Sequence, residues 1–210
     1  MFLEGITVRS RGRLPHWEKK EGIYFVTYRL ADSIPRSLIE YIKGEREDIV
    51  KTARQLNCEL SKDAIKRLNE LSNQKIEQYL DSGAGACYMN DPKIAKINAD
   101  TLLFYHNHHY ILFSYCIMPN HIHVVFQPIG SYTLAIILKS WKTFTSLNAN
   151  RILGRKGRFW QKEYYDHLIR NENELAQTIQ YVLKNPIKAG LKNWEWVWVN
   201  EEFWIISKNE

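Results

Sequence analysis

The sequence predicts an α+β fold in which helices pack on an antiparallel-rich central sheet. A β-branched and aromatic segment at 22–31 predicts one strand, two further strand segments meet at a turn at 119–120, and helical patterns separate and follow them. The order strand, helices, hairpin, helix, strand, helix is typical of this class. With 210 residues the chain suits one domain, 1–210, with a helical elaboration at about 34–104 after the first strand.

The first half of the chain contains the first strand and three helical stretches. Pro35 opens a long helical region in which apolar residues recur near helical spacing. Ser61 can cap a second helix over 61–80, and the run Ser82-Gly83-Ala84-Gly85 then breaks the pattern. Asp91-Pro92 is a suitable start for a third helix.

The second half begins with the hairpin. Residues 110–117 and 121–127 predict its two strands, with Pro119-Asn120 as the turn. An amphipathic helix is expected over 133–152, and a further strand over 159–169. No internal repeat interrupts this order.

The last helix is expected to run from Glu174 to about Lys184. Asn171 or Asn173 can cap its start, and Asn185-Pro186 is expected to end it, because proline cannot continue the backbone hydrogen bonds of a helix.

The bulk composition is that of an ordinary globular protein, with 45% hydrophobic and 25% charged residues. A formal charge of +6 and a pI of about 9.1 favour a polyanionic partner. Three cysteines without CxxC spacing predict neither a disulfide framework nor a zinc ribbon, so we expect a reducing compartment. The start of the chain lacks a signal-peptide pattern and no apolar run is long enough for a bilayer, so we expect a cytoplasmic protein without a membrane partner.

Basic and aromatic residues gather between residues 139 and 170. Basic groups can neutralise phosphates and aromatic faces can stack on unpaired bases, which predicts contact with nucleic acid. The alternative is a solvated basic helix with aromatic residues in the core. The basic residues are Lys139, Lys142, Arg151, Arg155, Lys156, Arg158, Lys162 and Arg170, and the aromatic residues are Trp141, Phe144, Phe159, Trp160, Tyr164 and Tyr165.

The segment Met118 to Phe126 contains two histidines, His121 and His123, directly after the turn. Alternate residues of a strand share a face, so both imidazoles are expected to point the same way, with Val125 beyond them. Two imidazoles at this spacing can share one metal ion, although strand histidines also serve in packing or hydrogen bonding. The residues expected on the opposite, core-facing side are Ile122, Val124 and Phe126.

Tyr181 and Asn185 are four residues apart and therefore share one face of the last helix. If this helix lies over the histidine-bearing face of the sheet, Asn185 becomes a third ligand and Tyr181 lies beside the metal. The alternatives are a rim aromatic for Tyr181 and a helix terminator for Asn185. The core-facing stripe would be Leu175, Ile179 and Val182, and the outward polar side Gln177, Tyr181, Asn185 and Lys188.

This set of residue types fits phosphoryl-transfer chemistry. Two neutral imidazoles and an amide leave a divalent cation, Mg²⁺ or Mn²⁺, with open positions for phosphate oxygens. Tyr181 could then attack phosphorus and form a covalent phosphotyrosine. The sequence names no general base.

Other histidines and tyrosines are candidates for the same roles. His106, His108 and His109 could bind a metal by spacing, but a solvated loop explains them better. Tyr164 and Tyr165 lie beside basic residues and could contact DNA instead.

Several segments, taken in order, resemble the REP-associated tyrosine transposases, which are relatives of the small single-strand transposases of insertion sequences. The matching segments are residues 13–17, 24–30, 85–88, 91–95, 118–124, 140–145, 159–164 and 181–191.

The resemblance implies a ferredoxin-like core of the HUH type, with metal ligands His121, His123 and, by position, Asn185, and with Tyr181 as nucleophile. It also implies recognition of single-stranded hairpins of repeated extragenic palindromes, and cleavage that leaves a 5′-phosphotyrosine and a free 3′-OH. The helical stretch at about 36–80 would be an elaboration, either a DNA-facing or a dimer-facing cap.

The sequence thus predicts a metal-dependent single-stranded DNA endonuclease and strand transferase, a transposase that associates with the nucleoid as a monomer or homodimer. A non-catalytic hairpin-binding regulator with the same fold is the alternative. A metal hydrolase of small phosphoesters is less well supported, because no carboxylate cluster accompanies the histidines. The expected DNA-binding residues are Arg11, Arg13, Lys139, Trp141, Lys142, Arg155, Lys156, Arg158, Trp160, Lys162 and Lys188.

Overall fold

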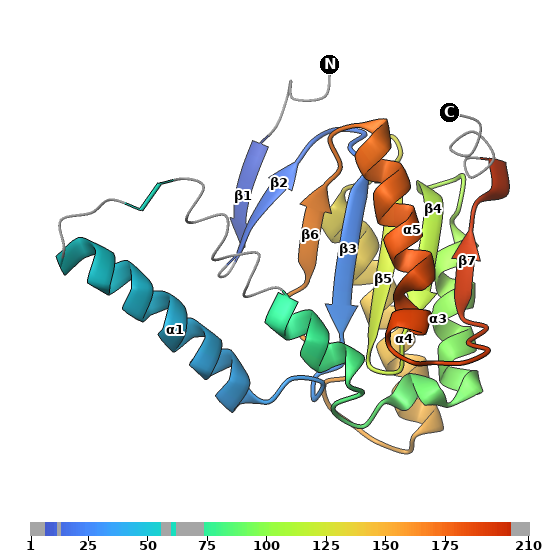
Figure 1. Cartoon of the computed structure of the whole chain (residues 1–210). Helices are drawn as coiled ribbons and strands as arrows, with labels where there is room; N and C mark the ends of the chain where they lie inside the picture. Colours follow the sequence, from blue (N-terminus) through green and yellow to red (C-terminus); the bar gives the residue numbers. More distant parts are fainter. Residues whose placement is uncertain (1–6, 12–13, 56–59, 62–73, 203–210) are drawn as a thin grey trace.

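The computed structural model describes residues 7–11, 14–55, 60–61 and 74–202. A five-stranded antiparallel sheet with the order β6-β3-β5-β4-β7 forms its centre, and a separate two-stranded ribbon, β1-β2, lies beside it (Figure 1). The strands are β1 (Thr7–Arg11), β2 (Leu14–Glu18), β3 (Tyr24–Arg29), β4 (Tyr110–Ile117), β5 (His121–Pro128), β6 (Tyr165–Leu168) and β7 (Val197–Val199).

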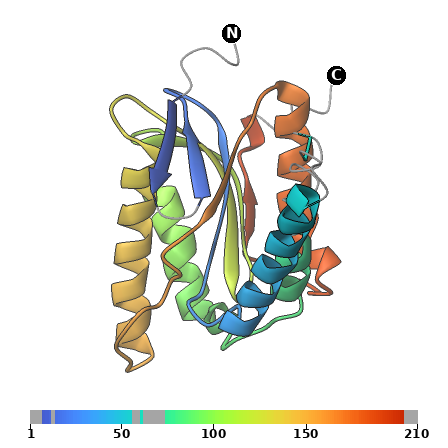
Figure 2. The ribbon, with the colours of Figure 1, turned by 90° about the vertical axis from the view of Figure 1, so that its left-hand side faces the viewer.

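The strand order β6-β3-β5-β4 is that of a ferredoxin-like fold, in which two βαβ halves interleave. Helices α3 (Pro92–Phe104) and α4 (Leu134–Ile152) cover one face of the sheet, and α5 (Glu172–Lys188) covers the other (Figures 1 and 2). The α+β class and the antiparallel sheet expected from the sequence are therefore confirmed.

Side chains of β5 alternate between two cores because successive residues of a strand point to opposite faces. Ile122, Val124 and Phe126 are fully buried in the larger core under α3 and α4. Val125 belongs to the smaller core, in which Ile179 and Val182 of α5 pack on the sheet. This alternation directs the two histidines of β5 towards α5, as expected.

Local signals fix the ends of the three packed helices. Asp91 accepts a hydrogen bond from the backbone N–H of Lys93 and caps α3, which has proline at its first position. Thr133 caps α4 in the same way. Asn171, one of the two residues expected for this role, caps α5 through the N–H of Glu174 (2.8 Å).

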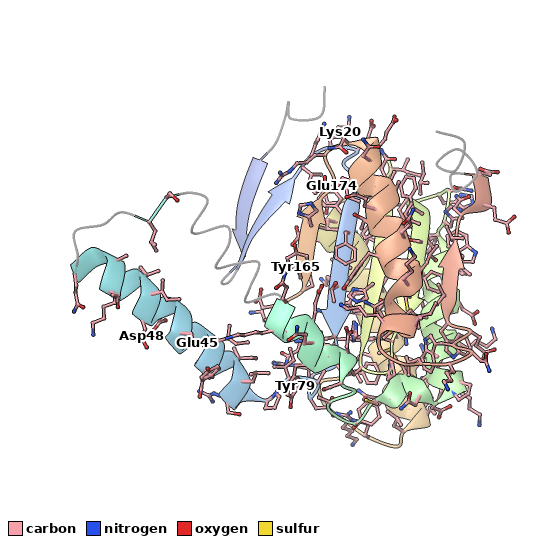
Figure 3. All side chains as sticks on the ribbon, in the orientation of Figure 1. Lys20, Glu45, Asp48, Tyr79, Tyr165 and Glu174 are labelled. Carbon is pink, nitrogen blue, oxygen red and sulfur yellow. The ribbon has the colours of Figure 1, made fainter. Side chains whose placement is uncertain are left out.

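The first part of the helical elaboration, up to residue 81, follows β3 and lies on the α5 side of the sheet, whereas its last helix, α3, covers the opposite face (Figures 1 and 2). Helix α1 (Arg36–Gln55) projects away from the sheet, and residues 74–81 form a short helix beside β3. Lys75 of this short helix pairs with Glu45 of α1 at 2.6 Å, and Figure 3 shows Glu45 at the part of α1 that is near the short helix. The helix expected over 61–80 is helical from 74 onwards, and residues 62–73 lie outside the described part.

Three expectations about the elements need correction. β1 and β2 precede the strand expected to be first, and β7 was not expected. The strand expected at 159–169 is regular only over Tyr165–Leu168, because Trp160 makes just an isolated bridge with Leu30. Helix α5 continues through Pro186 to Lys188, since a proline near the end of a helix removes only one hydrogen bond.

Among the described helices, none combines the length and the apolar character that crossing a bilayer requires.

Candidate functional site

The two histidines of β5 converge on one point of the α5-facing side of the sheet. His121 and His123 are each 1% exposed, and their Nε2 atoms lie 3.0 Å apart. β5 is bordered by β3 and β4, so the rigid centre of the sheet holds both imidazoles. The shared direction predicted from the spacing is confirmed.

Asn120 fixes the tautomer of His121. Its side-chain NH₂ donates to the carbonyls of Leu80 (3.0 Å) and Ala84 (2.8 Å), so its Oδ1 must act as an acceptor. That oxygen lies 2.6 Å from His121 Nδ1, which therefore carries the proton and leaves a lone pair on Nε2. The turn residue thus keeps the proton of His121 on Nδ1, and the lone pair of Nε2 faces His123.

Thr27 of β3 has the corresponding role for His123. Its hydroxyl lies 2.8 Å from His123 Nδ1 and can either donate to that nitrogen or accept from it. When it accepts, both Nε2 atoms present lone pairs to the same point. When it donates, His123 Nε2 carries a proton that it can share with His121.

Both imidazoles are held in the neutral form. Burial lowers the pKa of His121 well below its ordinary value, and the charges of His123 and Arg29 lower it further. Burial, with a contribution from Lys188, lowers the pKa of His123 to about 3. Neutral imidazole is the form that binds metals.

Tyr181 of α5 packs against His123 of this pair. Its ring centroid is 5.5 Å from that of His123 and 5.8 Å from that of Phe25, both in edge-on contact. Its hydroxyl oxygen is buried and has no hydrogen-bond partner within 3.5 Å in the described part of the chain. The structure thus brings the expected nucleophile to the histidine-bearing face.

The surroundings of Tyr181 keep its phenol protonated. Burial raises the pKa of Tyr181 well above its ordinary value, and the nearby carboxylate of Glu77 raises it further, whereas Asn185 favours the ionised form. Burial also raises the pKa of Glu77, partly offset by Tyr181 and Lys188. No sequence pattern indicated Glu77, which enters the site from the short helix 74–81.

Asn185 lies one turn after Tyr181 and is 1% exposed. Neither its Oδ1 nor its Nδ2 has a hydrogen-bond partner in the described part of the chain. The sequence pattern predicted that Asn185 lies on the outward polar side of the helix, which is wrong. Helix α5 packs so closely on the sheet that the Asn185 side chain is buried. A buried amide without partners is costly, unless a ligand satisfies it.

These donors fit a divalent cation. An octahedral ion with ligands at about 2.1 Å separates neighbouring ligands by about 3 Å, which matches the spacing of the two Nε2 atoms. The unpaired amide oxygen of Asn185 is a suitable third donor. In the described residues no group of three or more His, Cys, Asp or Glu is placed to hold a metal, so such a site would depend on an amide.

The exposed basic residues expected to bind DNA lie on α4, in the α4–β6 loop and at the end of α5. Lys139, Lys156, Arg158, Lys162 and Lys188 are exposed. Arg155 covers the ring of Tyr88 at 4.9 Å. Arg11 lies in β1, where only the backbone is described, and Arg13 lies outside the described residues.

The structure corrects the expectation for three of these residues. Trp141 and Trp160 are 2% and 4% exposed and belong to the larger core, so their rings offer no surface for bases. Their N–H groups are satisfied by Tyr110 and Thr145. The ammonium of Lys142 is likewise engaged, since it donates to the carbonyls of Gln161 (2.6 Å) and Lys162 (3.0 Å).

The histidine cluster before β4 has structural partners. The ring of His109 stacks between Tyr105 and Tyr132, with 3.8 Å between centroids on both sides. His106 accepts a hydrogen bond from the backbone N–H of Leu112 (3.0 Å). These contacts occupy both rings in packing and hydrogen bonding.

Part of the sequence matches one class of proteins. Residues 101–185, which include His121, His123, Tyr181 and Asn185, match the family model described as "Transposase IS200 like".

A more particular relative is a Haemophilus influenzae protein named as a REP-associated tyrosine transposase, 36% identical over 93 residues. The match covers 38% of this chain and 53% of the relative, so the chain spans about half of that relative's length. Together with the family model, this relative confirms the resemblance found in the sequence.

A solved structure of a REP-associated tyrosine transposase bound to a REP hairpin is also similar. It is 16% identical, with a TM-score of 0.49 over 90% of this chain and 82% of that one.

Proposed function

We propose that this protein is a metal-dependent endonuclease and strand transferase that cuts single-stranded DNA beside a hairpin. The observation that supports it most is the convergence of a phenol from α5 with two imidazoles from β5, 5.5 Å between the rings of Tyr181 and His123. The resemblance to REP-associated tyrosine transposases supports the choice of substrate.

His121, His123 and Asn185 would hold Mg²⁺ or Mn²⁺. The cation would supply a Lewis acid for the phosphate and help to ionise a neighbouring hydroxyl. Asn120 and Thr27 would orient the two imidazoles through their Nδ1 atoms.

Tyr181 performs the covalent step. Its oxygen bonds to phosphorus while the bond from phosphorus to the 3′-oxygen breaks, the phenol loses its proton, and the 3′-oxygen gains one. The product is a 5′-phosphotyrosine with a free 3′-OH. Because the new ester retains the energy of the old one, the 3′-OH of another strand can reverse the step and join the DNA.

The DNA would lie along the exposed basic residues. Lys156 and Arg158 lie in the loop that follows α4, beside the half-buried Arg155, and would neutralise phosphates without reading sequence. The protein would act on repeated extragenic palindromes, as a monomer or homodimer, in association with the nucleoid.

A covalent adduct assay tests this proposal. The wild-type protein, incubated with a 5′-tailed hairpin and Mn²⁺, should form a protein–DNA band that survives denaturation. Tyr181→Phe should abolish the band because the nucleophilic oxygen is gone, and His121→Ala should reduce it at least about 100-fold. Tyr165→Phe, which alters a tyrosine 6.2 Å from the same Phe25 ring, is the matched control and should retain the band. An undiminished band in Tyr181→Phe would exclude this nucleophile.

A second candidate is a hairpin-binding regulator without catalysis, which is favoured by the buried hydroxyl of Tyr181, since no base lies within hydrogen-bond distance of it in the described part of the chain. It predicts that hairpin binding is unchanged by EDTA and that no cleavage product forms during long incubation. Loss of substrate strand in the presence of metal would exclude it.

A further inference from the structure

Arg29 ends β3 at the edge of the site. The antiparallel register pairs Arg29 directly with His121, so the two side chains emerge on the same face of the sheet. Two residues earlier on that face, Thr27 binds the other imidazole. The guanidinium therefore belongs to the same layer of side chains as the proposed metal ligands.

The guanidinium has no partner of its own in the described part of the chain. Its Nε atom is buried without a hydrogen bond, and no carboxylate forms an ion pair with it there. Burial lowers the pKa of Arg29, and no nearby acid counteracts this. The positive charge of Arg29 also lowers the pKa of His121, which places the charge near the imidazole pair.

A partly buried, unpaired cation next to a site for a second cation is unfavourable until an anion arrives. A phosphodiester carries the required negative charge, and the planar guanidinium can donate two parallel hydrogen bonds to its oxygens. We infer that Arg29 binds a non-bridging oxygen of the scissile phosphate and stabilises the charge that develops there during attack by Tyr181. This inference rests on the proposed function.

A purely structural role for the Arg29 side chain has less support. Its backbone carbonyl accepts a hydrogen bond from Gln161 (2.9 Å), and the next residue, Leu30, bridges to Trp160. These contacts hold the end of β3 without the guanidinium. Side-chain substitutions should therefore leave the strand in place.

The kinetic test compares Arg29→Gln and Arg29→Lys with Arg36→Gln, whose arginine is exposed and pairs with Glu40. With saturating hairpin and Mn²⁺, Arg29→Gln should slow adduct formation about 100- to 1,000-fold, the usual effect of removing one donor to a developing charge. Arg29→Lys should form the adduct about tenfold more slowly than the wild type, since lysine keeps the positive charge but lacks the two parallel N–H donors of the guanidinium. Arg36→Gln should stay within about twofold. Hairpin affinity of Arg29→Gln should fall much less than its rate.

A second measurement does not depend on catalysis. The buried Nε–H of Arg29 should give a distinct ¹⁵N NMR signal, assigned by its loss in Arg29→Lys. Adding the hairpin to Tyr181→Phe protein, without metal, should shift this signal. The folded state of each variant is checked by circular dichroism, and Arg29→Lys replaces Arg29→Gln if the latter unfolds.

The outcomes separate the two proposals. If the wild type forms the adduct but Arg29→Gln forms it within threefold of the same rate, Arg29 does not bind the reacting phosphate, while the proposed function stands. If the hairpin binds without shifting the Arg29 signal, the inference is likewise overturned. If the wild type forms no adduct at all, the proposed function fails, and a shifted signal would then support phosphate binding by Arg29 alone.

Discussion

At the scale of single residues, the site depends on side chains that prepare the histidines as much as on the histidines. Asn120 is buried and uses both ends of its amide, two bonds to the carbonyls of Leu80 and Ala84 and one to His121. A hydroxyl has one hydrogen to donate and a carboxylate has none, so neither could bond both carbonyls and also accept from the imidazole.

Asn120→Ala should therefore weaken metal binding. Without the acceptor, His121 is free to place its proton on Nε2, the atom that should bind the metal, and the affinity for Mn²⁺ should fall about 10- to 100-fold. Calorimetric titration with Mn²⁺ measures this. Asn148→Ala is the control, since Asn148 donates to a carbonyl of its own helix, and should bind as the wild type does. Equal affinities for both variants would show that Asn120 does not orient His121.

At the scale of elements, the strand β5 shows which features can be predicted from sequence alone. Its faces follow from a period of two residues, which holds for any strand whatever its neighbours. The partner of His121 across the sheet, Arg29, could not be predicted, because that pairing joins strands nearly a hundred residues apart. For the same reason β7 was missed.

Helix α4 shows a different limit. Its periodicity predicted the helix and its bounds, but not whether Trp141 faces core or solvent. A large apolar ring with one polar N–H can lie either in the core or at the surface. Trp141 can be buried because the hydroxyl of Tyr110 accepts its N–H at 3.1 Å, a contact that the periodicity of α4 does not reveal.

The buried imidazoles of β5 should make the metal-free fold sensitive to acid. Their pKa values are lowered in the folded state, so the unfolded chain binds more protons than the folded one below about pH 6.5. The contribution of the two neutral imidazoles to the free energy of unfolding should be fully present above that pH. It should fall as the pH drops towards about 3, the pKa of His123 in the folded protein. The slope is at most about 1.4 kcal/mol per pH unit for each histidine.

Urea unfolding at several pH values between 7.5 and 4.5 measures this slope. His123→Gln should flatten it, whereas His108→Gln, a change at an exposed residue, should not. A wild-type stability that is constant over this range would contradict the neutral, buried state of the pair.

At the scale of the whole molecule, the helical elaboration is part of the site and not an appendage. The segment after α1 supplies the carbonyls of Leu80 and Ala84 that hold Asn120, and it brings Glu77 and Asp81 towards α5. The carboxylate of Asp81 lies 3.6 Å from the ammonium of Lys188, which is the last residue of α5. The sequence predicted the elaboration, but its contact with Tyr181 depends on how the chain returns to the sheet.

Glu77, which lies outside the ferredoxin-like core, should accordingly influence the pKa of the Tyr181 phenol. Its carboxylate raises the pKa of Tyr181, so Glu77→Gln should lower that pKa and let the phenol ionise at lower pH. Since burial is the larger cause and remains, the shift should be partial. The pH profile of adduct formation should move to lower pH, with a rate at neutral pH that is several-fold higher because more of the reactive form is present. Glu45→Gln, which breaks a pair between α1 and Lys75 of the same elaboration, should leave the profile unchanged. If the rate of adduct formation instead falls in Glu77→Gln, this carboxylate accepts the proton of Tyr181 during the attack. Its role as a base would then outweigh its effect of raising the pKa of Tyr181.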